Sequence, residues 1–327
     1  MSSLREKLRE EGSIAPIESI KPMRHYERVV LSRPIKTPHI DDVPSSVDPL
    51  DKALTIELRA QQVFKIGTKG PNEAKLMLPA DVVFKDNGHI IVADKCGLSI
   101  FDEAGELVKL CKRLKSIKRV CLTKDNKMAV TAYEDPAIKI LTMEGRMITQ
   151  FGEEDLVEPV ALGTNSKNEF IITDKVKHKI SIHDSEGALV KQVTSLDTVQ
   201  QRDLSYYLAI DRNDRIILSD CKNHCVKIFN SNGDFMKKFG CYGRTKGQLR
   251  NPHGVCVDPH GNIIVADGGN HRVCKFTSDG QFISHVLLHE DLMGEPRSIA
   301  ADGTGRLAVT SYGMASPPSI QMYQIYK

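Results

Sequence analysis

Two adjoining stretches, DPHGNIIVAD (residues 258–267) and NHRVCKF (residues 270–276), decide the fold because variants of them recur along the chain. Each copy contains an apolar run that ends in Asp or Thr, then a polar turn, then a second apolar run. The terminal Asp or Thr falls at positions 94, 131, 174, 220, 267 and 310. Strand-sized pieces that repeat every 40 to 50 residues are typical of a β-propeller. The pattern therefore predicts six blades.

Consecutive apolar residues in the marked runs, such as Ile90–Ala93 and Ile263–Ala266, predict strands that are buried on both faces. The last copy supplies only three strands, and we assign its missing outer strand to Leu54–Leu58 leading into Phe64–Gly67. Exchange of this strand between the ends of the repeat region would close the ring and leave no open edge. We therefore predict an all-β, six-bladed propeller over residues 54–327, closed by an N-terminal strand. Residues 1–53, which are rich in charge and proline, are predicted to be a flexible leader.

The 327 residues carry a formal net charge of +3, which does not by itself indicate a partner. No apolar stretch approaches the roughly 20 residues that span a bilayer, and the N-terminus lacks the apolar core of a secretory signal. We expect a soluble, cytoplasmic protein without a membrane partner. The eight cysteines are scattered, which indicates reduced core residues. A zinc site at Cys221, His224 and Cys225 is conceivable but not favoured.

Loops can be sorted by face from the order of the predicted strands. In an up-and-down blade, loops leading into the first strand and loops joining the second and third strands share one face, which we call the top face. Its predicted loops hold 18 Lys or Arg against 12 acids, whereas the opposite loops hold 5 against 14. Loops 112–119, 175–179 and 241–253 are basic and contain no acid, while loop 152–159 is acidic and should repel a polyanion locally. Such polarity suits a phosphate backbone, although surface lysines can also serve solubility alone.

Aromatic and amide side chains add candidates on the same face. Tyr133, Tyr206, Tyr207, Tyr242 and Tyr312 fall in or beside top-face loops, where they could stack on unpaired bases or pack between blades. Asn and His residues recur after the marker Asp. Because they recur, we favour a role in the turn, which the Asp would cap, over contacts to base edges.

The combination of Phe-Gly, Gly-x-Leu-x-x-Pro-x-Gly-Val, Ile-Ile-Val-Ala-Asp and Asn-His-Arg-Val resembles the NHL repeat, and in particular the propellers of TRIM-NHL proteins. The resemblance covers residues 54–327 and is strongest over 204–285. It implies binding of single-stranded or hairpin RNA, in mRNA 3′ untranslated regions, on a positive top face, with translational repression as the outcome. The implied positions flank the proline that leads into each blade and the turn after the Asp. Departures are the missing proline in the second and fourth units and Glu295, where an aromatic residue would stack.

The resemblance, the basic top-face loops and the tyrosines together predict a set of RNA-binding residues. They are Lys118, Arg119, Tyr133, Lys175, Lys177, Tyr206, Tyr207, Lys222, Asn223, Arg250, His253, Asn270, His271, Arg297 and Tyr312. Lysines and arginines would hold phosphates, tyrosines would stack bases and asparagines would add edge contacts. We expect no DNA partner.

Two other functions stay open. Six-bladed propellers include lyases and esterases that resemble one another in holding a metal in the central channel. The eleven histidines of this chain do not recur on the innermost strands, so we expect no catalytic residue, metal or cofactor. A protein-recognition platform, including one for co-repressors, is compatible with RNA binding.

Overall fold

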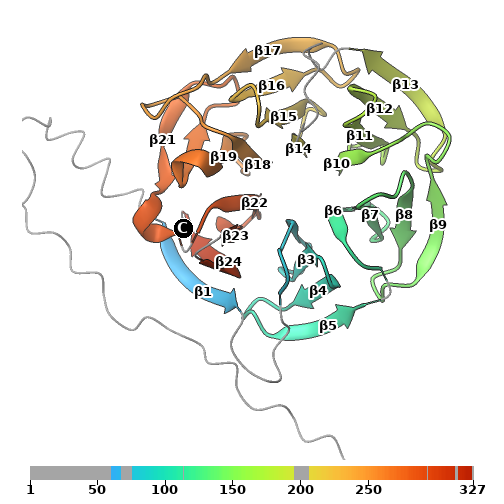
Figure 1. Cartoon of the computed structure of the whole chain (residues 1–327), viewed down its shortest axis with the longest axis horizontal. Coiled ribbons are helices and arrows are strands. Elements are labelled where there is room, and N and C mark those ends of the chain that lie inside the picture. The colour runs from blue at the N-terminus through green and yellow to red at the C-terminus, as the bar shows by residue number, and fades with distance from the viewer. Residues whose placement is uncertain are drawn as a thin grey trace, which may run out of the picture.

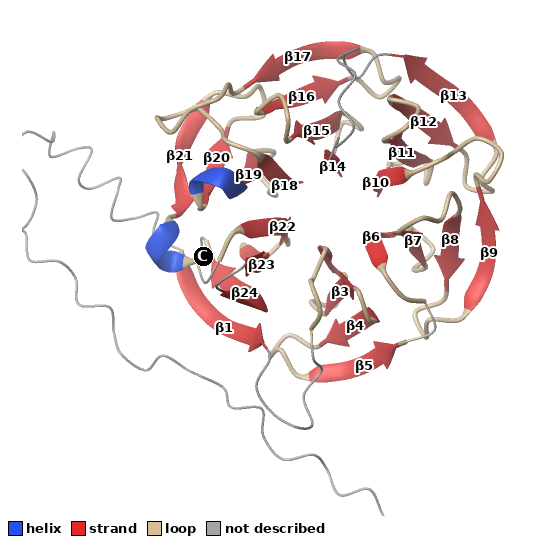
Figure 2. Ribbon diagram, viewed as in Figure 1, coloured by secondary structure: helices blue, strands red, loops and turns tan. Residues whose placement is uncertain are grey.

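The computed structural model describes residues 60–67, 76–112, 114–194, 206–292, 294–313 and 316–325. These residues form six antiparallel, four-stranded sheets that are arranged as blades around a central axis (Figure 1). The predicted six-bladed propeller is therefore confirmed. Apart from strands, the described ranges contain the short 3-10 helices η2 (Gly268–Asn270) and η3 (His289–Asp291), shown in blue in Figure 2. Neither these nor any other helix in the described ranges could cross a bilayer.

The strands follow the chain blade by blade, from the innermost strand outward. Blade 1 contains β2 (Asp81–Phe84), β3 (Ile90–Asp94), β4 (Gly97–Phe101) and β5 (Leu107–Cys111). Blade 2 contains β6 (Ile117–Leu122), β7 (Met128–Ala132), β8 (Ile138–Leu141) and β9 (Met147–Phe151). Blade 3 contains β10 (Pro159–Thr164), β11 (Phe170–Asp174), β12 (Lys179–His183) and β13 (Leu189–Thr194).

The second half of the ring has the same order. Blade 4 contains β14 (Tyr206–Ile210), β15 (Ile216–Asp220), β16 (Cys225–Phe229) and β17 (Phe235–Phe239). Blade 5 contains β18 (Pro252–Val257), β19 (Ile263–Asp267), β20 (Arg272–Phe276) and β21 (Phe282–Leu287). Blade 6 contains β22 (Pro296–Ala301), β23 (Arg306–Gly313), β24 (Ser316–Gln324) and β1 (Gln61–Gly67).

The core lies between neighbouring blades. Every residue of β3, β11, β15 and β19 is buried, as the consecutive apolar residues predict. One apolar cluster joins Ile217 and Ile228 of blade 4 to Val255 and Val265 of blade 5. Outer strands differ, since β9 and β17 each expose four of their five residues. Burial of apolar surface between blades, at about 25 cal/mol per Å², therefore holds the ring together.

Strand β1 closes the ring by pairing with β24, from Gln61 opposite Gln324 to Gly67 opposite Ser319 (Figure 1). An N-terminal closing strand was predicted, and the described strand begins at Gln61. The proposed strand at 54–58 and the predicted leader at 1–53 both lie outside the described residues.

The marker Asp, present in four of the six blades, fixes top-face turns, as Asp174 shows. Asp174 accepts backbone N–H groups of Val176 and Lys177 in its own turn, at 2.9 and 2.8 Å. Its other oxygen accepts N–H groups of Val157 and Glu158, at 2.6 and 3.0 Å, in the loop that leads into the blade. One buried carboxylate thus ties two top-face loops together, which confirms its predicted capping role.

Candidate nucleic-acid interface

A cup at the top of the channel, which we call the central cup, takes one side chain from the innermost strand region of every blade. These residues follow the blade-leading proline or its equivalent: Ala80, Lys118, Val160, Tyr207, His253 and Arg297. Equivalent positions meet here because the first strand of every blade lies next to the central axis (Figure 1). Arg119, Tyr133, Glu158, Lys175 and Tyr312 complete the lining, and the cup encloses about 180 Å³.

Arg119 forms the floor of the central cup. Its side chain is buried, and its guanidinium carbon lies 3.8 Å from the ring centroid of Tyr207. The guanidinium group donates to the carbonyls of Lys118, Tyr206 and Ala80, at 2.8, 3.2 and 3.3 Å. Because these bonds join three blades, Arg119 has one fixed position and carries its charge on the axis.

One wall of the cup is a lysine pair bridged by a carboxylate. Lys118 Nζ and Lys175 Nζ each lie 3.2 Å from Glu158 Oε1, and Lys118 Nζ also lies 4.7 Å from the ring centroid of Tyr133. Burial would raise the pKa of Glu158, but its hydrogen bonds with Lys175 and Lys118 hold that pKa below its usual value. The acidic loop 152–159 was expected to repel a polyanion. Its Glu158 instead neutralises one of the two lysines, so the wall keeps one positive charge.

The wall across the cup belongs to blades 5 and 6. His253 Nε2 lies 3.0 Å from Glu295 Oε1 and 2.8 Å from Arg297 Nη1, and Arg297 Nη2 donates to Glu295 Oε2 at 2.9 Å. Burial lowers the pKa of His253, with Glu295 opposing it, so the imidazole is neutral at pH 7. The carbon of the Arg297 guanidinium lies 4.9 Å from the ring centroid of Tyr312. This wall therefore offers a paired arginine beside a half-buried ring.

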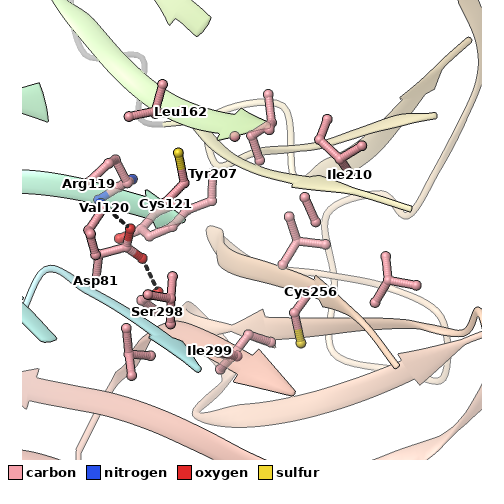
Figure 3. A pocket seen from close by; sticks show the side chains of 18 of the residues that line it. Asp81, Arg119, Val120, Cys121, Leu162, Tyr207, Ile210, Cys256, Ser298 and Ile299 are labelled. Atoms are coloured by element: carbon pink, nitrogen blue, oxygen red, sulfur yellow. Dashed lines mark hydrogen bonds between the residues drawn. The ribbon is translucent and has the colours of Figure 1, made fainter. Parts of the chain in front are cut away.

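Below Arg119 the channel widens into a second cavity of about 270 Å³, lined by the first strands. Figure 3 shows Asp81 in its wall, where it accepts hydrogen bonds from Ser298 Oγ at 2.6 Å and Val120 N at 3.0 Å. Burial raises the pKa of Asp81, although the charge of Arg119 opposes this. Arg119 and Tyr207 line both spaces and separate the cup from this lower cavity.

A Cys-His-Glu series borders the cup but is poorly suited to nucleophilic chemistry. Cys221 Sγ lies 3.4 Å from His253 Nδ1, whose ring reaches Glu295. Burial raises the pKa of Cys221 to about 12, and its thiol donates to the Pro252 carbonyl. A neutral buried thiol is a weak nucleophile. Over the residues the structure describes, no three His, Cys, Asp or Glu side chains are grouped as metal ligands.

The structure brings eight of the predicted residues together in the central cup: Lys118, Arg119, Tyr133, Lys175, Tyr207, His253, Arg297 and Tyr312. Six others lie in top-face loops or turns outside the cup: Lys177, Lys222, Asn223, Arg250, Asn270 and His271. Lys222 and His271 are exposed there, whereas Lys177 Nζ donates to the Asp155 carbonyl at 2.6 Å.

Tyr206 corrects the prediction. Its side chain is only 1% exposed and packs with Ile216 and Leu218 in the core of blade 4, so it cannot stack on a base in this conformation. Tyr207 is also buried, but it faces the cup beneath Arg119. The rings that are available for stacking are Tyr133 and Tyr242, with exposed fractions of 56% and 64%.

The recurring asparagines stabilise the turns in which they lie, which is the role that the sequence analysis favours. Asn270 Nδ2 donates to Gly243 O and to Asp267 Oδ2, both at 2.8 Å. Asn223 Nδ2 donates to Asp220 Oδ2 at 2.8 Å. These bonds hold both amides against the fold and weaken the suggestion that they read base edges.

Sequence reasoning missed Glu158 and Glu295 as members of the cup region. Both immediately precede a blade-leading proline, at Pro159 and Pro296. This shared position is the feature of the sequence that could have placed them near the cup. Each pairs with a cation that was assigned to RNA. The numbers of basic and acidic residues in each predicted loop do not show which loops contact one another, so they do not reveal these ion pairs.

Comparison with known proteins agrees with the repeat. Residues 208–229 and 249–276 match the NHL repeat. The chain is 32% identical to Protein brain tumor of Drosophila melanogaster over 115 residues, which are 33% of this chain and 10% of that protein. It is 26% identical to the B-box type zinc finger protein ncl-1 of Caenorhabditis elegans over 114 residues, or 33% of this chain and 13% of that protein. The chain thus spans only a small part of the length of either relative.

Solved structures share the architecture at low identity. A gluconolactonase from Xanthomonas campestris gives a TM-score of 0.63 at 16% identity, with 84% of this chain and 92% of that chain covered. A catalytically inactive virginiamycin B lyase from Staphylococcus aureus gives 0.55 at 13% identity, covering 82% and 89%. At such identity the likeness concerns the fold alone. The chain is thus a six-bladed β-propeller that carries NHL repeats at residues 208–229 and 249–276 and is similar, over 33% of its length, to Protein brain tumor and to ncl-1.

Proposed function

We propose that the top face of this propeller binds single-stranded RNA, and that the protein takes part in post-transcriptional repression of mRNA in the cytoplasm. The observation that carries the proposal is the central cup. Four cations, Lys118, Arg119, Lys175 and Arg297, meet there with three tyrosine rings from different blades. The similarity to Protein brain tumor and ncl-1 supports a role in RNA or protein recognition.

Binding would begin with the exposed cations around the cup. Lys222, Arg244 and Lys246 are exposed in neighbouring top-face loops, and each phosphate that such a side chain neutralises releases condensed counterions. An RNA strand that crosses from these loops to the cup meets two exposed rings. Tyr133 stands at the cup, and Tyr242 lies beside His224, with ring centroids 4.9 Å apart. Stacking of a base on such a ring contributes about 1 to 3 kcal/mol.

The proposal uses no catalytic group. The buried Cys221 thiol is in its neutral form, and the His253 imidazole is held between Glu295 and Arg297. A binding role therefore accounts for the cup better than hydrolysis or elimination does.

The test is a selection of RNA oligomers against the full chain, followed by titrations of the best binder at several salt concentrations. Lys175→Ala should weaken binding and reduce the salt slope by about 0.7, the value for one phosphate contact on a single strand. The matched control is Lys238→Ala, because Lys238 is an exposed cation on the outer strand β17. Equal effects of both substitutions, or binding without salt dependence, would contradict the assigned face.

A second candidate, recruitment of a protein partner, is favoured by a different surface. The outer strands expose apolar side chains near their first residues, including Met147 and Ile148 on β9, Val190 on β13, and Phe235 and Met236 on β17. These side chains lie on the outer strands of three consecutive blades, and exposed apolar surface is a common feature of interaction sites. The substitutions Phe235→Ser and Met236→Ser together should abolish protein capture and leave RNA affinity unchanged; loss of RNA affinity instead would refute separate surfaces.

A further inference from the structure

The charge of the central cup points to a particular kind of phosphate. Lys118, Arg119, Lys175 and Arg297 supply four positive charges, while Glu158 and Glu295 supply two negative ones. These six side chains sum to +2, and burial lowers the pKa of His253 and so disfavours a further charge there; Asp81 lies below Arg119 in the lower cavity and is not part of the cup lining. A phosphodiester within a strand carries one negative charge, whereas a phosphomonoester carries about −1.5 to −2 at pH 7. The cup therefore matches a terminal phosphate better than an internal one.

The shape of the cup leads to the same ligand. Its volume of about 180 Å³ leaves room for a small ligand group only. Arg119 and Tyr207 close the floor, so a strand that enters has to leave by the same opening. The end of a chain can enter such a space once, but an internal segment would have to fold back inside it.

Hydrogen-bond donors in the cup suit phosphate oxygens. The Arg297 guanidinium lies beside Tyr312, and Lys118 and Lys175 converge on one carboxylate oxygen that a phosphate oxygen could replace. Charged donors of this kind make short, strong bonds to phosphate.

We propose that the central cup binds a terminal phosphomonoester of RNA, with Lys118, Lys175 and Arg297 around the phosphate and Tyr133 against the terminal base. The inference rests on the proposed function and adds to it a preference for a phosphorylated strand end. Arg119 is a positioning residue, because three carbonyls hold it beneath the phosphate.

The test compares three forms of one fluorescent oligouridine of eight nucleotides: with a 5′-phosphate, with a 3′-phosphate, and with hydroxyls at both ends. One phosphorylated form should bind about tenfold more tightly than the hydroxyl form, as expected for one charge-assisted hydrogen bond or more. In Lys175→Ala and in Arg297→Gln the ratio should fall toward one. In the matched variant Lys222→Ala, which removes a cation outside the cup, all three forms should weaken equally and the ratio should persist.

A second arm does not depend on RNA. Uridine 5′-monophosphate and 3′-monophosphate should bind the full chain in calorimetric titrations, whereas uridine should not, and urea unfolding would verify that each variant is folded. If all RNA forms bind within twofold of one another, the terminal-phosphate inference is wrong and the RNA proposal stands. If RNA fails to bind but a monophosphate binds in a manner that depends on Lys175 and Arg297, the phosphomonoester site stands and the RNA function is wrong. Failure of both arms overturns both.

Discussion

Asp174 offers the sharpest test of how this propeller holds its top face, because a single carboxylate joins two loops there. The side chain is 2% exposed and accepts four backbone hydrogen bonds, from Val157, Glu158, Val176 and Lys177, at 2.6 to 3.0 Å. Asp174→Ala leaves these four N–H groups without their acceptor. An unsatisfied buried donor costs about 1 to 3 kcal/mol. Four such donors at the low end would cost about 4 kcal/mol. Since the loops reach the surface and water can replace part of this loss, we expect a total of about 3 kcal/mol.

Urea unfolding followed by circular dichroism measures this loss directly. For a domain of this size, about 3 kcal/mol corresponds to a fall of roughly 6 to 12 °C in Tm. Asp174→Asn keeps one acceptor oxygen and should lose about half as much stability. RNA binding should also weaken in Asp174→Ala, because the freed loop carries Glu158 and the turn carries Lys175.

Asp184 provides the matched control. It accepts backbone N–H groups of Glu186 and Ala188 at 3.0 and 2.8 Å, but in a turn that faces solvent. Water can replace both bonds, so Asp184→Ala should cost about 0.5 kcal/mol or less. If Asp174→Ala destabilises the protein no more than Asp184→Ala does, burial does not increase the contribution of the marker carboxylate to stability.

Three further outcomes follow from burial on the top face. Tyr206→Ala should destabilise the fold by about 3 to 5 kcal/mol, as for other large core aromatics, with RNA affinity per folded molecule changed less than in Lys175→Ala; urea unfolding and titration together check this. Because burial lowers the pKa of His253, the unfolded chain binds its proton more readily, so stability should fall as pH drops below about 6.5 toward the folded pKa. His253→Gln should flatten that part of the pH profile, and an unchanged profile would refute the assignment. Cys241 is exposed and should react with iodoacetamide before buried Cys221, as mass spectrometry would show; faster labelling of Cys221 would indicate an open cup.

Repetition made much of this structure predictable from sequence. The marker positions gave six blades, and the residues beside the blade-leading prolines or their equivalents were candidates from the sequence. Of these, the structure places Lys118, His253 and Arg297 in the central cup. Tyr206 was not placed correctly, since neighbouring residues of a strand point to opposite sides and the pattern did not show which of the two tyrosines faces the axis.

Contacts between repeats were harder to predict. Glu158 belongs to blade 3 but reaches Lys118 of blade 2, and only the packing of these two neighbouring blades brings them together. Shifts in strand pairing add to the difficulty. In blades 2, 3, 5 and 6 the register between the first and second strands shifts at the start of the first strand. A local bulge turns a side chain toward or away from the channel, and the repeat pattern carries no signal for it.

The closing pair of β1 and β24 also decides how the ring responds to force. Gln61 lies opposite Gln324, so handles attached at residues 60 and 325 load the strand pair at its end. Tension applied there would break the hydrogen bonds between β1 and β24 one after another. Tension along the strands would instead have to break all of them at the same time. The propeller should consequently open at low load and begin with the sixth blade, which makes the seam between the two chain ends the mechanical weak point of an otherwise continuous circle.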